Sequence, residues 1–193
     1  MQTEGRAPLK SSRAQSARRL FISLAISIFA VDLATKNWAD SYLQYREPLR
    51  IIGDFLKLSY STNSGAAFSL FTDGTLLLSS LKLAVIGFLI FYMRNVTNPL
   101  WGAALGTLLG GVAGNLYDRA LRPPGVWRGE VIDWIMVPNW PTFNIADSAI
   151  VLAGIAMTIL TMRNIQPKGS NDHDESNDSS QSGRNEDLEE PKR

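Results

Sequence analysis

Long apolar stretches alternate with polar segments along this 193-residue chain and set its expected architecture. Four of them stand out, at residues 20–38, 75–93, 100–117 and about 144–162. Each is close to the ~20 residues that an α-helix needs to cross a bilayer. We therefore predict an all-α membrane protein with four transmembrane helices, and an even number of spans leaves both termini on one side.

The first apolar stretch admits a second interpretation, because it follows a basic segment at residues 1–19. A basic start before an apolar run is also typical of a cleaved signal peptide. Here the run continues through Asp32 and Lys36 to Trp38 without a small-residue cleavage site of the usual kind. We therefore expect a retained first helix.

The polar segments differ from one another in composition. Residues 39–74 include IIGDFLKLSYS and AAFSLF, where β-branched and aromatic residues around Gly and Asn indicate short strands and turns. We predict a small β-rich platform outside the bilayer core there, and a loop at 117–143. Residues 164–193 are mostly polar and acidic. They have too little apolar surface to offset the entropy of ordering, so we expect a disordered tail.

Glycine recurs every four residues in the third apolar stretch, at Gly102, Gly106, Gly110 and Gly114. This spacing places small residues on one helix face, where a neighbouring helix can approach closely in lipid. We expect a tight helix–helix contact along that face.

Basic residues indicate how the helices cross the membrane. The N-terminal segment, Arg94, Arg163 and Lys168 all fall on one side of the four predicted spans. The positive-inside rule makes that side cytoplasmic, although the 117–143 loop is also partly basic. Both termini are then cytoplasmic, and the polar helix ends next to that loop lie near the outer face.

The residue inventory excludes several kinds of chemistry. The chain has no cysteine, which excludes disulfides, thiol nucleophiles and cysteine-ligated metal, and its one histidine, His173, lies in the tail. No cluster of side chains has the spacing of metal ligands, so we expect neither a metal nor another cofactor. The net charge of +1 favours no particular partner. We expect a lipid bilayer around the chain and no nucleic acid.

Three carboxylates, Asp118, Asp133 and Asp147, lie at or between the ends of the last two apolar stretches. Ionisable groups at membrane depth are costly, and by default they indicate a function. On a helix, Asn115 is three residues from Asp118, and Asn144 has the same spacing from Asp147. Each amide therefore shares a helix face with a carboxylate.

Two carboxylates held close together cannot both ionise easily, so the pair shares a proton. The ionised member can take a proton from water while the neutral member donates one to a carbonyl oxygen. We therefore predict a membrane-embedded aspartic peptidase that needs no metal, thiol or imidazole. The residues alone allow Asp118 as readily as Asp133 in this pair.

Other interpretations of the same residues stay open. An aspartate can cap a helix or form an ion pair, for example Asp118 with Arg119 or Arg122. A proton- or cation-coupled transporter would use carboxylates spread through the membrane depth, and a non-catalytic lipid-binding scaffold would tolerate their loss. Ser79 and Ser80 near Lys82 suggest a serine–lysine peptidase, which their positions in the middle of a span disfavour.

Five short motifs follow one another along the chain. They are Asp32 with Lys36, Asn63-Ser-Gly-Ala-Ala-Phe68, Gly114-Asn-Leu-Tyr-Asp-Arg119, Val131-Ile-Asp-Trp134 and Phe143-Asn-Ile-Ala-Asp147. Each is weak alone, but in this order between four spans they are highly specific. Over residues 20–163 the chain resembles lipoprotein signal peptidase, the type II signal peptidase of bacteria.

The resemblance implies a peptidase domain at 20–163 in the bacterial inner membrane. It implies that the enzyme removes signal peptides from prolipoproteins by cutting before a diacylglyceryl-modified cysteine. The 39–74 platform would be an extracytoplasmic cradle, and the 117–143 loop a flap over the site.

By motif position, the resemblance makes Asp133 and Asp147 the catalytic pair. Asp118 becomes a supporting residue, paired with a cation such as Arg119. Four residues are implied to line the site, holding substrate or ordering the aspartates: Asn63, Asn115, Arg119 and Asn144. A structural or interfacial role is implied for Asp32 and Lys36.

Overall fold

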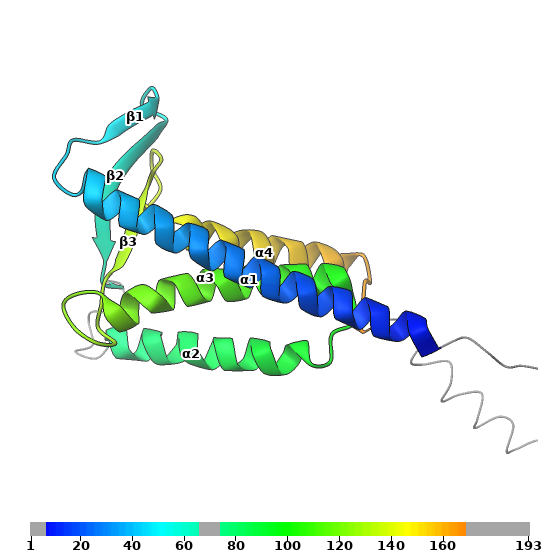
Figure 1. The fold of residues 1–193 in the computed structure, drawn as a ribbon. Coiled ribbons are helices and arrows are strands. Elements are labelled where there is room, and N and C mark those ends of the chain that lie inside the picture. The colour runs from blue at the N-terminus through cyan, green and yellow to red at the C-terminus, as the bar shows by residue number, and fades with distance from the viewer. Residues whose placement is uncertain (1–6, 66–73, 169–193) are drawn as a thin grey trace, which may run out of the picture.

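The computed structural model describes residues 7–65 and 74–168, and in these ranges the chain forms four long helices and a small sheet. The helices are α1 (Ala7–Leu43), α2 (Gly74–Met93), α3 (Pro99–Leu121) and α4 (Ile145–Met162). They run lengthwise beside one another, and the sheet lies at one end of the bundle (Figure 1). α3 is the central helix, because it packs against each of the other three.

Two of the described helices are long and apolar enough to cross a membrane by length and composition, Thr75–Met93 in α2 and Ile145–Met162 in α4. Their bounds follow the second and fourth apolar stretches of the sequence closely. α1 is less apolar overall because it includes part of the basic N-terminal segment, and α3 is rich in glycine.

α1 is longer than the first apolar stretch predicts. It begins inside the basic segment and continues to Leu43, into the region expected to form the platform. Its N-terminal end extends past the other helices (Figure 1). The only proline or glycine in α1 is Pro8, which lies in the first turn where proline is tolerated, so nothing in the sequence interrupts the helix.

The described strands form a three-stranded antiparallel sheet in the order β1-β2-β3. β1 (Leu49–Ile52) and β2 (Leu56–Asn63) fall within the predicted platform. The expected loop at 117–143 is wrong in two places, because α3 continues to Leu121 and β3 (Val131–Met136) pairs with β2. β3 is a six-residue strand held by pairing with distant residues, which local pattern does not reveal. The expected strand AAFSLF lies outside the described residues.

The glycine face of α3 packs tightly against α1, as its spacing predicted. A Cβ at Gly102 would overlap the backbone of Ala17, and a Cβ at Gly106 would overlap that of Phe21. Farther along, Gly114 lies against the Asp32 side chain. The close α1–α3 approach therefore continues to the end of the bundle that carries the polar residues.

Gly106→Ala is expected to destabilise the bundle by about 1–3 kcal/mol, because the added methyl group meets the backbone of α1, which cannot move aside locally. The measurement is thermal unfolding of the purified protein in detergent. Gly154→Ala in α4 is the matched control, since nothing lies within 4 Å of that position and alanine favours a helix. Equal melting temperatures for the two variants would contradict the tight contact.

The end of the bundle opposite the sheet is closed by the residues that follow α4. The Trp101 indole N–H donates to the Ile165 carbonyl at 2.7 Å, and the Thr97 and Asn98 amides donate to the Pro167 carbonyl at 3.0 Å. Residues 164–168, which we expected to begin the disordered tail, are thus bonded to the α2–α3 turn. The rest of that expected tail lies outside the described residues.

Candidate active site

The polar residues singled out in the sequence converge at the end of the bundle that carries the sheet. They come from five elements: Asp32 and Lys36 on α1, Asn63 on β2, Asn115, Asp118 and Arg119 on α3, Asp133 on β3, and Asn144 and Asp147 at the start of α4. One hydrogen-bonded network therefore contains four aspartates at a single end of the bundle, whereas a transport path would spread them along it.

The side chain of Asp147 is oriented by the way α4 begins. Asn144 caps the helix by accepting a hydrogen bond from the Asp147 amide at 2.9 Å. Asp147 Oδ2 in turn accepts from the Asn144 amide at 3.3 Å, which completes a capping box. The other oxygen, Oδ1, accepts from Asn115 Nδ2 at 2.8 Å. The helix start and α3 together fix this half-buried carboxylate.

Asp133 is held near the start of α4 because β3 forms backbone hydrogen bonds with Phe143. In β3 it pairs with Ser61 of β2, so Asn63 at the end of β2 reaches the same carboxylate and donates to its Oδ2 at 3.3 Å. Asn144 Nδ2 donates to Asp133 Oδ1 at 2.6 Å. Asp133 is 3% exposed.

Two asparagines connect the two aspartates. Asn144 Nδ2 lies within 3.3 Å of Asn115 Oδ1 as well as bonding Asp133, and Asn115 Nδ2 bonds Asp147. Lys36 Nζ donates to Asn115 Oδ1 at 2.9 Å and fixes the orientation of that amide. An amide holds a carboxylate without supplying a full positive charge, so this arrangement leaves the pair able to keep a proton.

Burial first, and the negative charge of Asp147 second, raise the pKa of Asp133 to about 6. The hydrogen bonds from Asn144 and Asn63 and the charge of Lys36 act in the opposite direction. At neutral pH a larger fraction of Asp133 is therefore protonated than of an ordinary aspartate. A carboxyl that titrates near the working pH suits general acid–base chemistry.

The titration of Asp133 should be measurable directly. We expect its carboxyl to titrate near pH 6 in the wild type, and at lower pH in Asp147→Asn, because that variant removes the neighbouring charge. Isotope-edited infrared spectroscopy of the carboxyl band in the purified protein is the measurement. Because the folded-state pKa lies above the ordinary 3.8, ionising Asp133 opposes folding. This cost is absent at low pH, develops between about pH 4 and 6, and is full above. A wild-type titration near pH 4 would contradict the assignment.

Asp118 has different neighbours from the other two candidate carboxylates. It forms ion pairs with Lys36 at 2.9 Å and with Arg122 at 2.6 Å, and it is fully buried. The expected pairing with Arg119 is wrong, and the alternative pairing with Arg122 is confirmed. Arg122, the C-cap residue that follows α3, is four residues from Asp118 and reaches its carboxylate. Arg119 instead bonds the Gly129 carbonyl.

Lys36 and Asp32 join three helices. Lys36 Nζ lies 2.7 Å from Asp32 Oδ2 and 2.9 Å from Asp118 Oδ2, with both Lys36 and Asp32 fully buried. Asp32 Oδ1 accepts a hydrogen bond from the Ala146 amide in the first turn of α4 at 2.8 Å. A carboxylate at a helix N-terminus is favourable, so this group also fixes the start of the helix that carries Asp147.

Arg119 of α3 contacts the loop that precedes β3. Its Nη1 donates to the Gly129 carbonyl at 3.2 Å, and its guanidinium acts electrostatically on Asp133. A Cβ at Gly65 would come within 3.3 Å of Arg119 Nη2, and Gly65 has a positive φ of 80°. The positive φ favours glycine there, and the arginine leaves little room for a Cβ. The Gly65 amide also donates to Asn63 Oδ1 at 2.8 Å, which orients the side chain that reaches Asp133.

The sequence did not single out the contacts that Arg122 makes with α1. Arg122 Nη2 donates to Asn37 at 2.8 Å, and its Nη1 lies 3.4 Å from Asp40. Asp40 in turn accepts a hydrogen bond from the Tyr60 hydroxyl of β2. Burial of Tyr60, and next this hydrogen bond, raise the pKa of Tyr60 to about 12. The one sequence feature that could have indicated these contacts is the four-residue spacing of Lys36 and Asp40, which places Asp40 on the same face of α1 as Lys36.

Comparison with known proteins shows the family of this chain. Residues 24–163 match the family model described as Signal peptidase (SPase) II. The chain is 39% identical over 160 residues to the lipoprotein signal peptidase of Streptomyces coelicolor, covering 82% of this chain and 78% of that protein. It is 38% identical over 166 residues to that of Rhodococcus jostii, covering 86% and 83%.

The fold also has a counterpart among solved structures. A structure titled as a bacterial membrane enzyme at 1.9 Å superimposes with a TM-score of 0.66 at 24% sequence identity, covering 73% of this chain and 91% of that one. The architecture, four packed helices with a sheet over one end, is therefore similar to the fold of that solved structure. By its sequence, the chain belongs to the signal peptidase II family, whose members are peptidases.

Proposed function

We propose that this chain is an aspartic endopeptidase that removes the signal peptide from prolipoproteins, cutting before a diacylglyceryl-modified cysteine. The single observation that carries the proposal is the pair Asp133 and Asp147, joined through Asn115 and Asn144 in a buried network. Membership of the signal peptidase II family supports the substrate class.

The proposed reaction needs one proton shared between the two aspartates. Burial raises the pKa of Asp133, so we place the shared proton on Asp133 and assign the role of base to Asp147. Asp147 takes a proton from water, the oxygen of that water adds to the scissile carbonyl carbon, and Asp133 gives its proton to the carbonyl oxygen. The resulting diol collapses when the carbon–nitrogen bond breaks and a proton passes to the leaving nitrogen. Arg119 and Asn63 are suited to hold the substrate backbone beside the pair.

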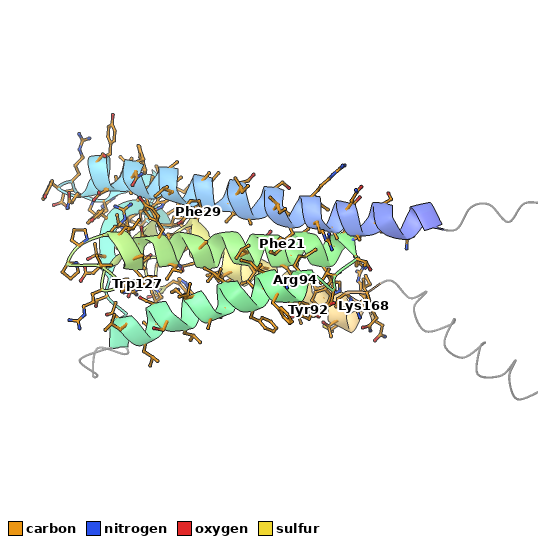
Figure 2. All side chains as sticks on the ribbon, turned by 60° about the horizontal axis from the view of Figure 1, so that its bottom comes forward. Phe21, Phe29, Tyr92, Arg94, Trp127 and Lys168 are labelled. Atoms are coloured by element: carbon orange, nitrogen blue, oxygen red, sulfur yellow. The ribbon has the colours of Figure 1, made fainter. Side chains whose placement is uncertain are left out.

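We further propose that all four helices span the inner membrane, with both termini cytoplasmic and the site near the outer face. The apolar character of α2 and α4 supports spanning. Arg94 and Lys168 lie together at the end away from Trp127 and the sheet (Figure 2), as the positive-inside rule requires of a cytoplasmic end. Under this proposal residues 1–19 and 164–193 are cytoplasmic segments, and the sheet is the cradle for substrate.

The test is cleavage of a prolipoprotein by the purified full chain in detergent, with EDTA present. We expect mass spectrometry to show cleavage immediately before the cysteine when that cysteine carries diacylglyceryl, and no cleavage of the same prolipoprotein without the lipid. Cleavage of both substrates alike would contradict the proposed specificity. No cleavage of either would overturn the proposed activity.

A further inference from the structure

Lys82 is the one charged side chain in the apolar span Thr75–Met93 of α2. A charge at membrane depth is costly and usually faces the protein interior or a water-filled space. Lys82 is half-buried, and none of the ion pairs or hydrogen bonds among the described residues involves it. The network described above does not account for it.

The position of Lys82 on α2 directs it toward the site. Thr75 Oγ1 donates to the Ser64 carbonyl at 3.2 Å, and Ser79 Oγ donates to the Trp127 carbonyl at 3.1 Å. Trp127 lies at the sheet end of the bundle, next to α2 and α3 (Figure 2). Lys82 follows these residues at the i+7 and i+3 positions and is therefore on the same helix face, one turn deeper.

The same face of α2 continues inward into the contact with α3. Val85 and Leu89 pack in the apolar cluster that includes Leu105 of α3. Lys82 thus lies between polar contacts on one side and apolar contacts with α3 on the other. We term this face the α3-facing stripe of α2. It consists of Thr75, Ser79, Lys82, Val85 and Leu89. A side chain in this stripe points into the bundle and not toward lipid.

Four charged groups from three other helices and the sheet act on the Lys82 ammonium. They are Arg119 of α3, Asp147 of α4, Lys36 of α1 and Asp133 of β3. Both carboxylates in this set are the members of the candidate pair, and Arg119 is itself attracted first by Asp133 and then by Asp118 and Glu130.

The three cations in this group differ in how many ion pairs and hydrogen bonds they form. Lys36 forms ion pairs with Asp32 and Asp118, so much of its charge is balanced. Arg119 donates a hydrogen bond to the Gly129 carbonyl, whereas Lys82 forms no hydrogen bond or ion pair with any of the described residues. The positive charge of Lys82 is therefore available to the aspartate pair, and in a poorly polarisable interior it acts over several ångströms.

We propose that Lys82 is a positioning residue for the proposed peptidase reaction. Its ammonium, held on the α3-facing stripe of α2, adds positive charge on the α2 side of Asp147. This charge favours the ionised carboxylate that takes a proton from water. The inference rests on the proposed function and extends it to a residue outside the five sequence motifs.

The experiment compares pH profiles of kcat/KM for cleavage of a diacylglyceryl-modified prolipoprotein. Lys82→Met removes the charge and keeps the length of the side chain, and Lys82→Arg keeps the charge. Leu83→Met is the matched control, because the next residue is 52% exposed and faces away from the site. We expect both limbs of the Lys82→Met profile to move to higher pH by about one unit, while Lys82→Arg and Leu83→Met follow the wild type.

A Lys82→Met profile that superimposes on the wild type would overturn the inference, as would an equal shift in Lys82→Arg. Infrared titration of Asp133 without substrate gives an independent reading, in which Lys82→Met raises the Asp133 pKa. If Lys82→Met does not fold, Lys82→Gln takes its place in both measurements. Inactive wild-type protein would overturn the proposed function, and an unchanged Asp133 titration would then separately overturn the role of Lys82.

Discussion

Asp147→Asn and Asp133→Asn are each expected to lower kcat by about 10⁴-fold or more, because neither asparagine can take a proton from water or return one. Asparagine keeps one oxygen as an acceptor, so the capping hydrogen bond at the start of α4 can persist and the fold should survive. The measurement is single-turnover cleavage of the lipid-modified prolipoprotein, with unfolding temperatures recorded for each variant.

Asp54→Asn is the matched control for these two variants. Asp54 lies between β1 and β2 and pairs at the surface with Lys57 and Arg50, away from the network. Its removal should leave cleavage unchanged. Full activity in Asp133→Asn or Asp147→Asn would remove that residue from the pair, and Asp118 would become the next candidate.

The helices, and the residue pairs that share one helix turn, were predictable from the sequence. Apolar stretches predicted the bounds of α2 and α4, because a helix that crosses a membrane needs an uninterrupted run of mostly apolar residues. The i, i+3 spacing of Asn144 and Asp147 appears in the structure as a capping box. The i, i+4 spacing of Asp118 and Arg122 appears as an ion pair.

Contacts between distant elements were not predictable in the same way. The choice between Asp118 and Asp133 depended on family motifs, because both lie between the last two apolar stretches and neither has a local pattern that marks it as catalytic. The structure separates their environments: Asp118 contacts Lys36 across the α1–α3 interface, and Asp133 accepts a hydrogen bond from Asn63 through pairing of β3 with β2. Both contacts depend on packing, which periodicity along one chain segment does not encode.

Lys36→Met is expected to destabilise the protein by about 3–5 kcal/mol, because it leaves Asp32 and Asp118 buried without their shared cation. Asp118 retains Arg122, whereas Asp32 retains only the Ala146 amide among its described partners. Most of the cost should therefore come from Asp32. The measurement is reversible unfolding of the purified protein in mixed micelles by a chemical denaturant.

Lys57→Met provides the same chemical change at the surface. Lys57 pairs at 2.9 Å with Asp54, whose side chain is 73% exposed, so water can solvate the carboxylate that is left. The loss there should be at most about 1 kcal/mol. Adding Asp32→Asn to Lys36→Met should recover part of the stability, since the least compensated buried charge is removed with its partner. If Lys36→Met and Lys57→Met cost the same, or if the second substitution lowers stability further, then Lys36 does not compensate buried carboxylates. The bundle end that carries Asp147 would then be held chiefly by packing along the glycine face of α3.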